Sequence, residues 1–152
     1  MQVTEADRRL LRHLQQDPEV SAGELAARAG MTPATCSRRL EKLTQAGVIR
    51  GQHAQINWAA LGFEVAVSLR ITLEKSDPHA FDAFLAKARK VPEVIEIQTF
   101  LGRVDVRLHI LARDMAHYQH IYRAKILTLP HLAEVEALVQ MAEIKTGEAL
   151  PL

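Results

Sequence analysis

The strongest constraint in this sequence is the series of helix-start and helix-stop signals in its first fifty residues. Thr4, Ser21 and Thr32 each stand where a hydroxyl can cap the first turn of a helix. Gly30 and Gly47 follow the second and third helical segments and suit the left-handed residue beyond a helix end. These signals predict three helices, with a short second helix, a tight turn and a longer third helix. That layout is typical of a helix-turn-helix.

The third predicted helix, residues 33–46, carries two distinct faces. Cys36, Leu40 and Leu43 recur at i, i+4 and i+7 and are expected to face the core. A different face carries the polar and basic residues Thr35, Arg38, Arg39 and Lys42. Two structural helices need no such stripe, whereas arginine can bond guanine edges or phosphates and lysine neutralises phosphate. The stripe therefore favours a helix that reads DNA over a purely structural helix pair.

Charge supports this interpretation only locally. The 152-residue chain has a net charge of +1, but residues 25–50 hold five Lys or Arg and one acid. A basic segment on a nearly neutral protein indicates a local contact with a polyanion. A solvated helix face is the alternative that charge alone leaves open.

Composition places the chain among folded cytosolic proteins. Its uncharged apolar runs are far shorter than the ~20 residues that span a bilayer, and its first residues lack the apolar core of a signal peptide. The single cysteine, Cys36, excludes an internal disulfide and a zinc site built from several cysteines. We expect Cys36 to be a small core residue, with a redox-sensing thiol as the alternative.

The remainder of the chain alternates between strand and helix patterns. Residues 63–74 alternate without a break, with apolar side chains from Phe63 to Leu73 on one face. The patterns predict helices over 77–91 and 114–129 and strands over 94–101, 105–112 and 133–144. The order βαββαβ indicates an α+β, ferredoxin-like domain with two helices on one sheet face. The expected domains are residues 1–50, a connecting strand and hinge at 51–62, and 63–152. Mixed residues on the open sheet face suit burial against another subunit.

Patterns typical of enzymes and metal sites are weak. The sequence contains no phosphate-binding glycine loop, no GxGxxG and no GxSxG. His117 and His120 are spaced i, i+3 as two metal ligands might be, but solvated histidines are the preferred interpretation. Arg107 and His109 share one strand face as a catalytic pair would, yet polar residues at a subunit contact explain them better. We therefore expect no catalytic residue, no metal and no cofactor.

The turn from Gly102 to Asp105 is a candidate ligand site. A glycine turn followed by a carboxylate offers a backbone nest and an acceptor for an ammonium group. Ordinary turn chemistry is the alternative explanation of the same pair.

Four segments resemble the Lrp/AsnC (feast/famine) transcription regulators of bacteria and archaea. They are ADRRLLRHLQQD, SAGELAARAGMTPATCSRRLEKLTQAGVIRG with its continuation HAQINWAALG, VPEVIEIQTFLGRVDVRL, and EIKTGEALPL. These segments span nearly the whole chain, and their order and spacing make the match specific. The last segment is closer to local regulators of amino-acid breakdown than to the global leucine-responsive type.

The resemblance implies a winged helix-turn-helix that binds a double-stranded DNA operator. The residues that it assigns to DNA are Thr32, Pro33, Thr35, Ser37, Arg38, Arg39, Lys42 and Arg50. It also implies a cytoplasmic, nucleoid-associated protein with no membrane contact. Members of the family dimerise through the sheet, and their dimers often associate into octamers. Their effectors are small molecules, usually amino acids, bound between dimers near the Gly-x-x-Asp turn. The corresponding residues are Leu101, Gly102, Arg103, Val104, Asp105, Glu136 and Leu138.

This sequence departs from the family at the expected effector site. An aromatic residue is common where Val104 stands, and Arg107 replaces a usual apolar residue. The last strand often offers small hydroxyl residues, but Glu136, Ala137 and Leu138 stand at those positions. One hypothesis is that Arg103 or Arg107 favours an acidic group on the effector.

Two other functions fit parts of the same pattern. One is an architectural nucleoid protein that binds DNA with little sequence preference, although the modest charge excess disfavours it. The other is an enzyme similar to the sirohaem decarboxylases, which share the two-part architecture and use histidine and arginine chemistry. The intact basic stripe on residues 33–46 disfavours the enzyme.

Overall fold

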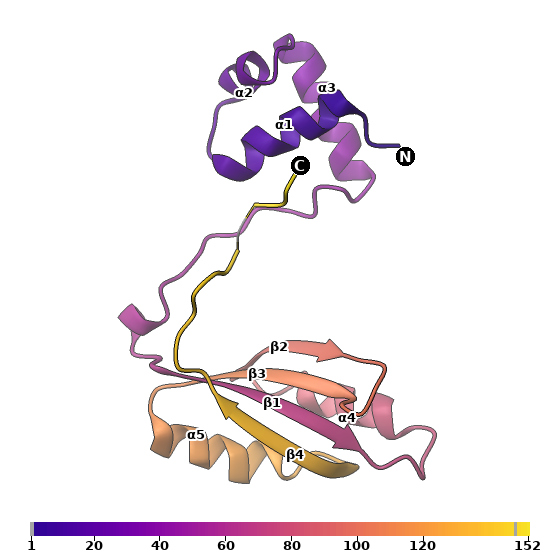
Figure 1. Cartoon of the computed structure of the whole chain (residues 1–152), viewed down its shortest axis with the longest axis vertical. Coiled ribbons are helices and arrows are strands. Elements are labelled where there is room, and N and C mark those ends of the chain that lie inside the picture. The colour runs from indigo at the N-terminus through magenta and orange to yellow at the C-terminus, as the bar shows by residue number, and fades with distance from the viewer. Residues whose placement is uncertain (1, 148) are drawn as a thin grey trace. The chain divides into compact units, whose positions relative to one another are not determined.

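Three helices form the N-terminal part of the computed structural model, which describes residues 2–147 and 149–152 (Figure 1). They are α1 (Glu5–Gln16), α2 (Ala22–Arg28) and α3 (Pro33–Gln45). The side-chain oxygens of Thr4, Ser21 and Thr32 each accept a hydrogen bond from the backbone N–H three residues later, which confirms the three predicted caps. Gly30 and Gly47 have φ angles of 66° and 70°, so both occupy the left-handed region that favours glycine.

A small apolar core holds the three helices together. The side chains of Leu10, Leu25, Cys36 and Leu43 are fully or almost fully buried and belong to one cluster. The predicted inner face of the third helix is therefore confirmed. Because each helix contributes at least one of these side chains, the position of α3 depends on its packing against both α1 and α2.

A buried carboxylate ties α1 to α3. Asp7 is 3% exposed, and its carboxylate accepts hydrogen bonds from the backbone N–H (2.8 Å) and the hydroxyl (2.6 Å) of Thr4. Arg39 Nη1 donates to the other oxygen of Asp7 at 2.7 Å. The first turn of α1 and the middle of α3 are thus joined by a charged hydrogen bond that is mostly shielded from water.

A four-stranded sheet with two helices forms the second part of the chain. Its elements are β1 (Val65–Leu73), α4 (Ala80–Ala88), β2 (Val94–Thr99), β3 (Val106–Ala112), α5 (Met115–Ile121), a π-helical turn at Tyr122–Ile126, and β4 (Leu132–Val139). The strands are antiparallel in the order β2-β3-β1-β4. Both helices cover the same face of the sheet (Figure 1). The predicted βαββαβ fold is confirmed.

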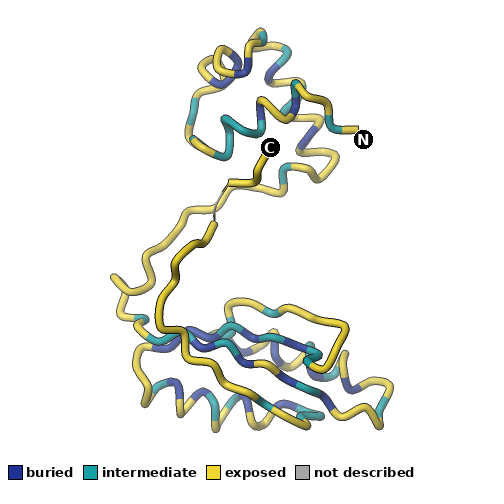
Figure 2. The backbone as a smooth tube through the Cα atoms, in the orientation of Figure 1, coloured by how far each residue is buried: buried dark blue, intermediate teal, exposed yellow. Residues whose placement is uncertain are grey.

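The alternation on β1 separates the core from the open face. Val67, Leu69 and Ile71 are fully buried and pack in one cluster with Phe84 of α4 and Ile121 of α5. Buried residues alternate with more exposed ones along the central strands (Figure 2). The alternate residues Ala66, Ser68, Arg70 and Thr72 therefore point to the sheet face that carries no helix.

Several predicted bounds differ from the structure. The last strand ends at Val139 rather than at residue 144. Among the described residues β4 pairs with β1 alone, and β1 begins at Val65, so the N–H of Gln140, which donates to the carbonyl of Ala66, makes the last contact between them. The connector at 51–62 contains no strand among its described residues and forms only a short 3₁₀ helix, since no neighbouring segment pairs with its backbone. The helix predicted over 77–91 spans only Ala80–Ala88, and the strand predicted over 94–101 ends at Thr99.

The C-terminal residues group with the N-terminal helices. One compact unit comprises Met1–Gln55 together with Ile144–Leu152, and the other comprises Ile56–Glu143. The sequence analysis assigned the whole of 63–152 to the second domain. In the structure the end of the chain belongs to the first unit instead, because Leu150 and Leu152 are hydrogen-bonded to side chains of α1. Periodicity does not reveal these contacts.

Loss of the Asp7 carboxylate is expected to destabilise the N-terminal unit. Burial by itself raises the pKa of Asp7, but the hydrogen bonds from Thr4 and Arg39 outweigh it and hold the pKa below its usual value. The stability that this carboxylate contributes is present above the unfolded-state pKa of about 3.9 and is lost as the pH falls through the folded-state pKa. Asp7→Asn should therefore lower the free energy of unfolding by about 2 kcal/mol at pH 7, and by less in acid.

Urea unfolding monitored by circular dichroism at pH 7 and pH 3.5 measures this effect. Glu5→Gln is the matched control, since Glu5 lies in the same helical turn and is exposed. Equal stability of Asp7→Asn and Glu5→Gln at pH 7 would show that the Asp7 network contributes nothing.

Candidate DNA-binding face and ligand groove

The residues that the sequence assigned to DNA lie on α3 and just after it. Thr32 and Pro33 occupy the N-cap and first helical positions, and the hydroxyl of Thr32 donates to that of Thr35 at 2.9 Å. Ser37, Arg38, Lys42 and Arg50 are exposed. The N-terminal half of α3 thus presents short polar side chains, and the exposed basic side chains follow them.

Arg38 and Lys42 differ from Arg39 in their contacts. Within the described residues, the side chains of Arg38 and Lys42 make no ion pair and no hydrogen bond, whereas Arg39 is half-buried and bonded to Asp7. Arg38 and Lys42 are spaced i and i+4 on α3, and like charges at that spacing destabilise a helix by a few tenths of a kcal/mol.

A polyanion bound at this face would remove the repulsion between these two side chains. Arg39 has a structural role that the periodicity did not reveal.

Cys36 is enclosed in the core of the three-helix unit. Its side chain is fully buried, and burial raises the pKa of the thiol. A reactive cysteine needs exposure and a lowered pKa, and Cys36 has neither. The predicted packing role fits this environment.

The Gly102–Asp105 turn is fastened to β1 by its backbone and by the Asp105 carboxylate. The N–H of Asp105 donates to the carbonyl of Ile71 at 2.9 Å, and Asp105 Oδ2 accepts from the N–H of Leu73 at 2.9 Å. Lys75 Nζ lies 3.8 Å from Asp105 Oδ1. The acceptor that the sequence offered to a ligand ammonium is thus already bonded to a backbone N–H and lies beside the ammonium group of Lys75.

An open groove of about 520 Å³ lies beside this turn on the sheet face without helices. It is lined by Arg70, Thr72, Arg103, Val104, Glu134, Val135 and Glu136. Arg103, Val104 and Glu136 were expected at an effector site. The other expected residues do not line this groove: they are Leu101, Gly102, Asp105 and Leu138. Sequence reasoning missed Arg70, Thr72 and Glu134, although the alternation of residues 63–74 already placed Arg70 and Thr72 on the outward face.

Strand register explains why these side chains meet. Arg70 is the cross-strand partner of Glu136, and Thr72 is the partner of Glu134. Arg70 Nη1 lies 3.6 Å from Glu136 Oε2, but both side chains are more than half exposed, so this pair adds little stability. Within the described residues, Arg103 and Glu134 have no ion-pair partner. The groove therefore offers one free positive and one free negative charge.

One member of each pair singled out in the sequence, Arg107 and His117, has a structural partner. Arg107 Nη2 bonds Glu96 Oε2 at 3.0 Å. His117 Nδ1 accepts from the N–H of Arg113, and its own N–H donates to Asp114, so it takes part in the start of α5. No three His, Cys, Asp or Glu side chains among the described residues are placed to hold a metal ion.

Comparison with known proteins identifies the two parts. Residues 4–50 match the winged helix-turn-helix DNA-binding domain, and residues 66–150 match the Lrp/AsnC ligand binding domain. The chain belongs to the Lrp/AsnC family of transcriptional regulators. No described helix of this regulator is both long and apolar enough to cross a membrane.

Relatives align with this Lrp/AsnC chain over most of its length. The leucine-responsive regulatory protein of Salmonella typhimurium is 32% identical over 144 residues, which are 95% of this chain and 88% of the relative. A Neisseria meningitidis transcriptional regulator solved in complex with L-Met is 26% identical, with a TM-score of 0.91 over 99% of this chain and 97% of that one. Escherichia coli AsnC is also 26% identical, with a TM-score of 0.87 over 96% of this chain and 97% of its own.

Replacement of Asp105 is expected to destabilise the sheet domain. Asp105→Ala leaves the N–H of Leu73 without its acceptor, so we expect the free energy of unfolding to fall by about 1–2 kcal/mol and the Leu73 amide to exchange faster. Asp82→Ala, an exposed aspartate on α4, is the control for urea unfolding and hydrogen exchange. Unchanged stability and exchange in Asp105→Ala would contradict the structural role and favour a role in ligand binding.

Proposed function

We propose that this Lrp/AsnC regulator binds a specific operator, that an amino acid or a related small metabolite controls its affinity for DNA, and that its targets are local genes of amino-acid metabolism. The observation that carries the proposal is the outer face of α3. Its two exposed cations, Arg38 and Lys42, have no partner among the described residues, on a helix held in place by Arg39 and the core.

On this proposal, α3 lies in the major groove of the operator. Arg38 bonds base edges or phosphates, and Lys42 and Arg50 neutralise phosphates. The short residues at the start of α3 approach the DNA backbone: Thr32, Pro33, Thr35 and Ser37. Arg39 uses one guanidinium nitrogen for Asp7 and has others left for a phosphate.

A homodimer would place two α3 helices at matched half-sites. Apolar side chains support an assembly through the sheet domain, because several are exposed near its open face and edges. They are Ile95, Phe100, Leu101, Leu138 and Val139. We propose that a second copy covers this surface and that dimers associate into octamers.

The ligand groove suits a zwitterion. Arg103 provides a cation for an α-carboxylate, and Glu134 provides an anion for an ammonium group. The L-Met bound to the Neisseria meningitidis relative is an amino acid, which supports the same class of effector for this chain. An amino acid that binds one assembly state more tightly would shift the population toward it and thereby change operator affinity.

Arg38 is expected to contribute to operator affinity without contributing to stability. Arg38→Ala should raise the Kd for the operator by about 5- to 150-fold, which corresponds to about 1–3 kcal/mol. If Arg38 contacts a phosphate, the slope of log K against log salt should also fall by about 0.9. Fluorescence anisotropy with a labelled duplex from the regulator's own upstream region measures both quantities.

Two arginine variants serve as controls for Arg38→Ala. Arg9→Ala removes an exposed arginine from α1 and should leave DNA affinity unchanged. Arg39→Ala should lower the free energy of unfolding as well as DNA affinity, because it leaves Asp7 without its cation. Wild-type affinity in Arg38→Ala would remove α3 from the proposed interface, and binding without sequence preference would favour an architectural protein.

The free carboxylate of the groove is expected to set effector sensitivity. Glu134→Gln should raise the effector concentration for half-maximal change in operator binding by about 10- to 100-fold, since it removes the charged partner of an ammonium group. Glu64→Gln changes an exposed glutamate just before β1 and is the control. An unchanged effector concentration in Glu134→Gln, with a wild-type response otherwise, would place the effector elsewhere.

A further inference from the structure

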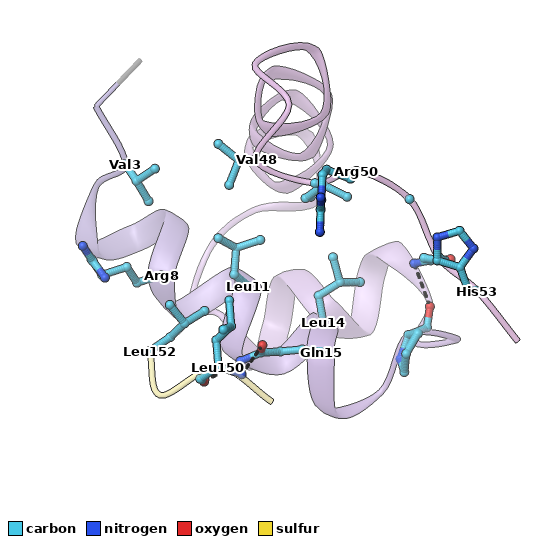
Figure 3. Close-up of a pocket in the computed structure, with 14 residues that line it drawn as sticks. Val3, Arg8, Leu11, Leu14, Gln15, Val48, Arg50, His53, Leu150 and Leu152 are labelled. Carbon is cyan, nitrogen blue, oxygen red and sulfur yellow. Dashed lines mark hydrogen bonds between the residues drawn. The ribbon is translucent and has the colours of Figure 1, made fainter. Parts of the chain in front are cut away.

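The end of the chain is hydrogen-bonded to the side of α1. Gln15 Nε2 donates to the carbonyl of Leu150 at 3.0 Å, and Gln15 Oε1 accepts from the N–H of Leu150 at 2.8 Å. Arg12 Nε donates to the carbonyl of Leu152 at 2.9 Å. Figure 3 shows Gln15 beside Leu150, with Leu152 along the same helix. Residues 149–152 are called the tail below.

The geometry of these bonds is that of peptide recognition. A carboxamide carries the same donor and acceptor as a peptide group, so Gln15 pairs with Leu150 as a neighbouring strand would. Arg12 and Gln15 are three residues apart and therefore lie on one face of α1. Pro151 has no N–H, so no backbone donor is left unused between the two bonded leucines.

An apolar groove lies beside these bonds. A space of about 830 Å³ is lined by Leu11 and Leu14 of α1 and by Val48, and Leu150 and Leu152 form part of its wall (Figure 3). The leucines of the tail thus contribute apolar surface next to the two polar anchors. Polar anchors beside an apolar groove are typical of sites that bind an extended peptide segment.

The tail also has a particular position along the chain. It follows β4, which carries Glu134 and Glu136 of the ligand groove, and it groups with the N-terminal helices rather than with the sheet. The chain therefore joins the DNA-binding unit to the sheet unit twice, once through the connector at 51–62 and once through the residues between β4 and the tail.

We propose that the face of α1 formed by Gln15, Arg12 and the adjacent apolar groove is a binding site for the regulator's own tail, and that the docked tail is a releasable strap that transmits the state of β4 to the DNA-binding unit. The three bonds are made at partly or fully exposed positions, where water can replace them, so the strap can open without unfolding either unit. The transmission rests on the proposed effector response, whereas the docking does not.

Hydrogen exchange of the full-length protein tests the docking. Gln15→Ala removes both bonds to Leu150, and the peptide that contains Leu150 and Leu152 should exchange at least about fivefold faster than in wild type. Gln16→Ala is the matched control, because Gln16 is the adjacent glutamine, is exposed and makes no hydrogen bond with its side chain within the described residues. Equal exchange in wild type, Gln15→Ala and Gln16→Ala would overturn the proposal.

Cross-linking tests whether the tail belongs to the same chain. The double variant Arg8→Cys, Leu152→Cys keeps Gln15 and Leu150, and both new cysteines line the groove; it is treated with a short bismaleimide, with each single variant as a control. Native Cys36 is fully buried and should not react. A linked pair of peptides, found by mass spectrometry of digested protein that migrates at monomer mass on a denaturing gel, supports the strap. A product of dimer mass would overturn it, because the partner's tail would then occupy the site.

Operator titrations with and without a pool of the twenty amino acids test the transmission. We expect the change in Kd caused by the pool to be at least about fivefold smaller in Gln15→Ala than in wild type, and to be the same in Gln16→Ala as in wild type. A full response in Gln15→Ala, despite faster exchange of its tail, would overturn transmission through the strap. Wild-type protein that binds no DNA would overturn the proposed function but leave the exchange result, and hence the docking, standing.

Discussion

The hydrogen-bonded ion pair between Asp7 and Arg39 sets the position of the proposed DNA-binding face of α3. A carboxylate that is almost completely buried needs partners for its charge, and Thr4 and Arg39 provide them. Because Arg39 leaves the middle of α3 and reaches the first turn of α1, the two helices keep a fixed relation. The neighbouring Arg38 and Lys42 are then presented outward, with no partner among the described residues. One arginine of the basic stripe therefore orients the helix while the others are available to DNA.

The sheet domain depends in a similar way on β1. It pairs with both β3 and β4, its inner residues fill the core, and its outer residues Arg70 and Thr72 line the ligand groove. The Asp105 carboxylate fastens the Gly102–Asp105 turn to the end of this strand. Because β4 and that turn are both bonded to β1, a displacement of either would change the contacts of β1.

Local signals predicted much of this structure. The hydroxyl caps at Thr4, Ser21 and Thr32 and the uninterrupted alternation of residues 63–74 depend on neighbouring residues, so they can be read from the sequence. The features that the sequence analysis missed depend on partners that are distant in the sequence. Helical spacing placed Arg39 on the basic stripe, but it could not show that Asp7 lies within 2.7 Å. Alternation gave the outward face of β1, but only the register with β4 brings Arg70 and Thr72 beside Glu134 and Glu136. The return of the tail to α1 depends on Gln15, about 135 residues away, and leaves no periodic trace.

The measurement that tests the central claim most directly is a titration of wild-type protein against its own upstream duplex and against a shuffled duplex of equal length. Both titrations are made at one fixed salt concentration, with and without a pool of the twenty amino acids. The account predicts at least about tenfold tighter binding to the upstream duplex, and a shift of that affinity by the pool. Equal affinity for both duplexes, unchanged by the pool, would contradict the claim that this chain is a sequence-specific regulator controlled by an amino acid.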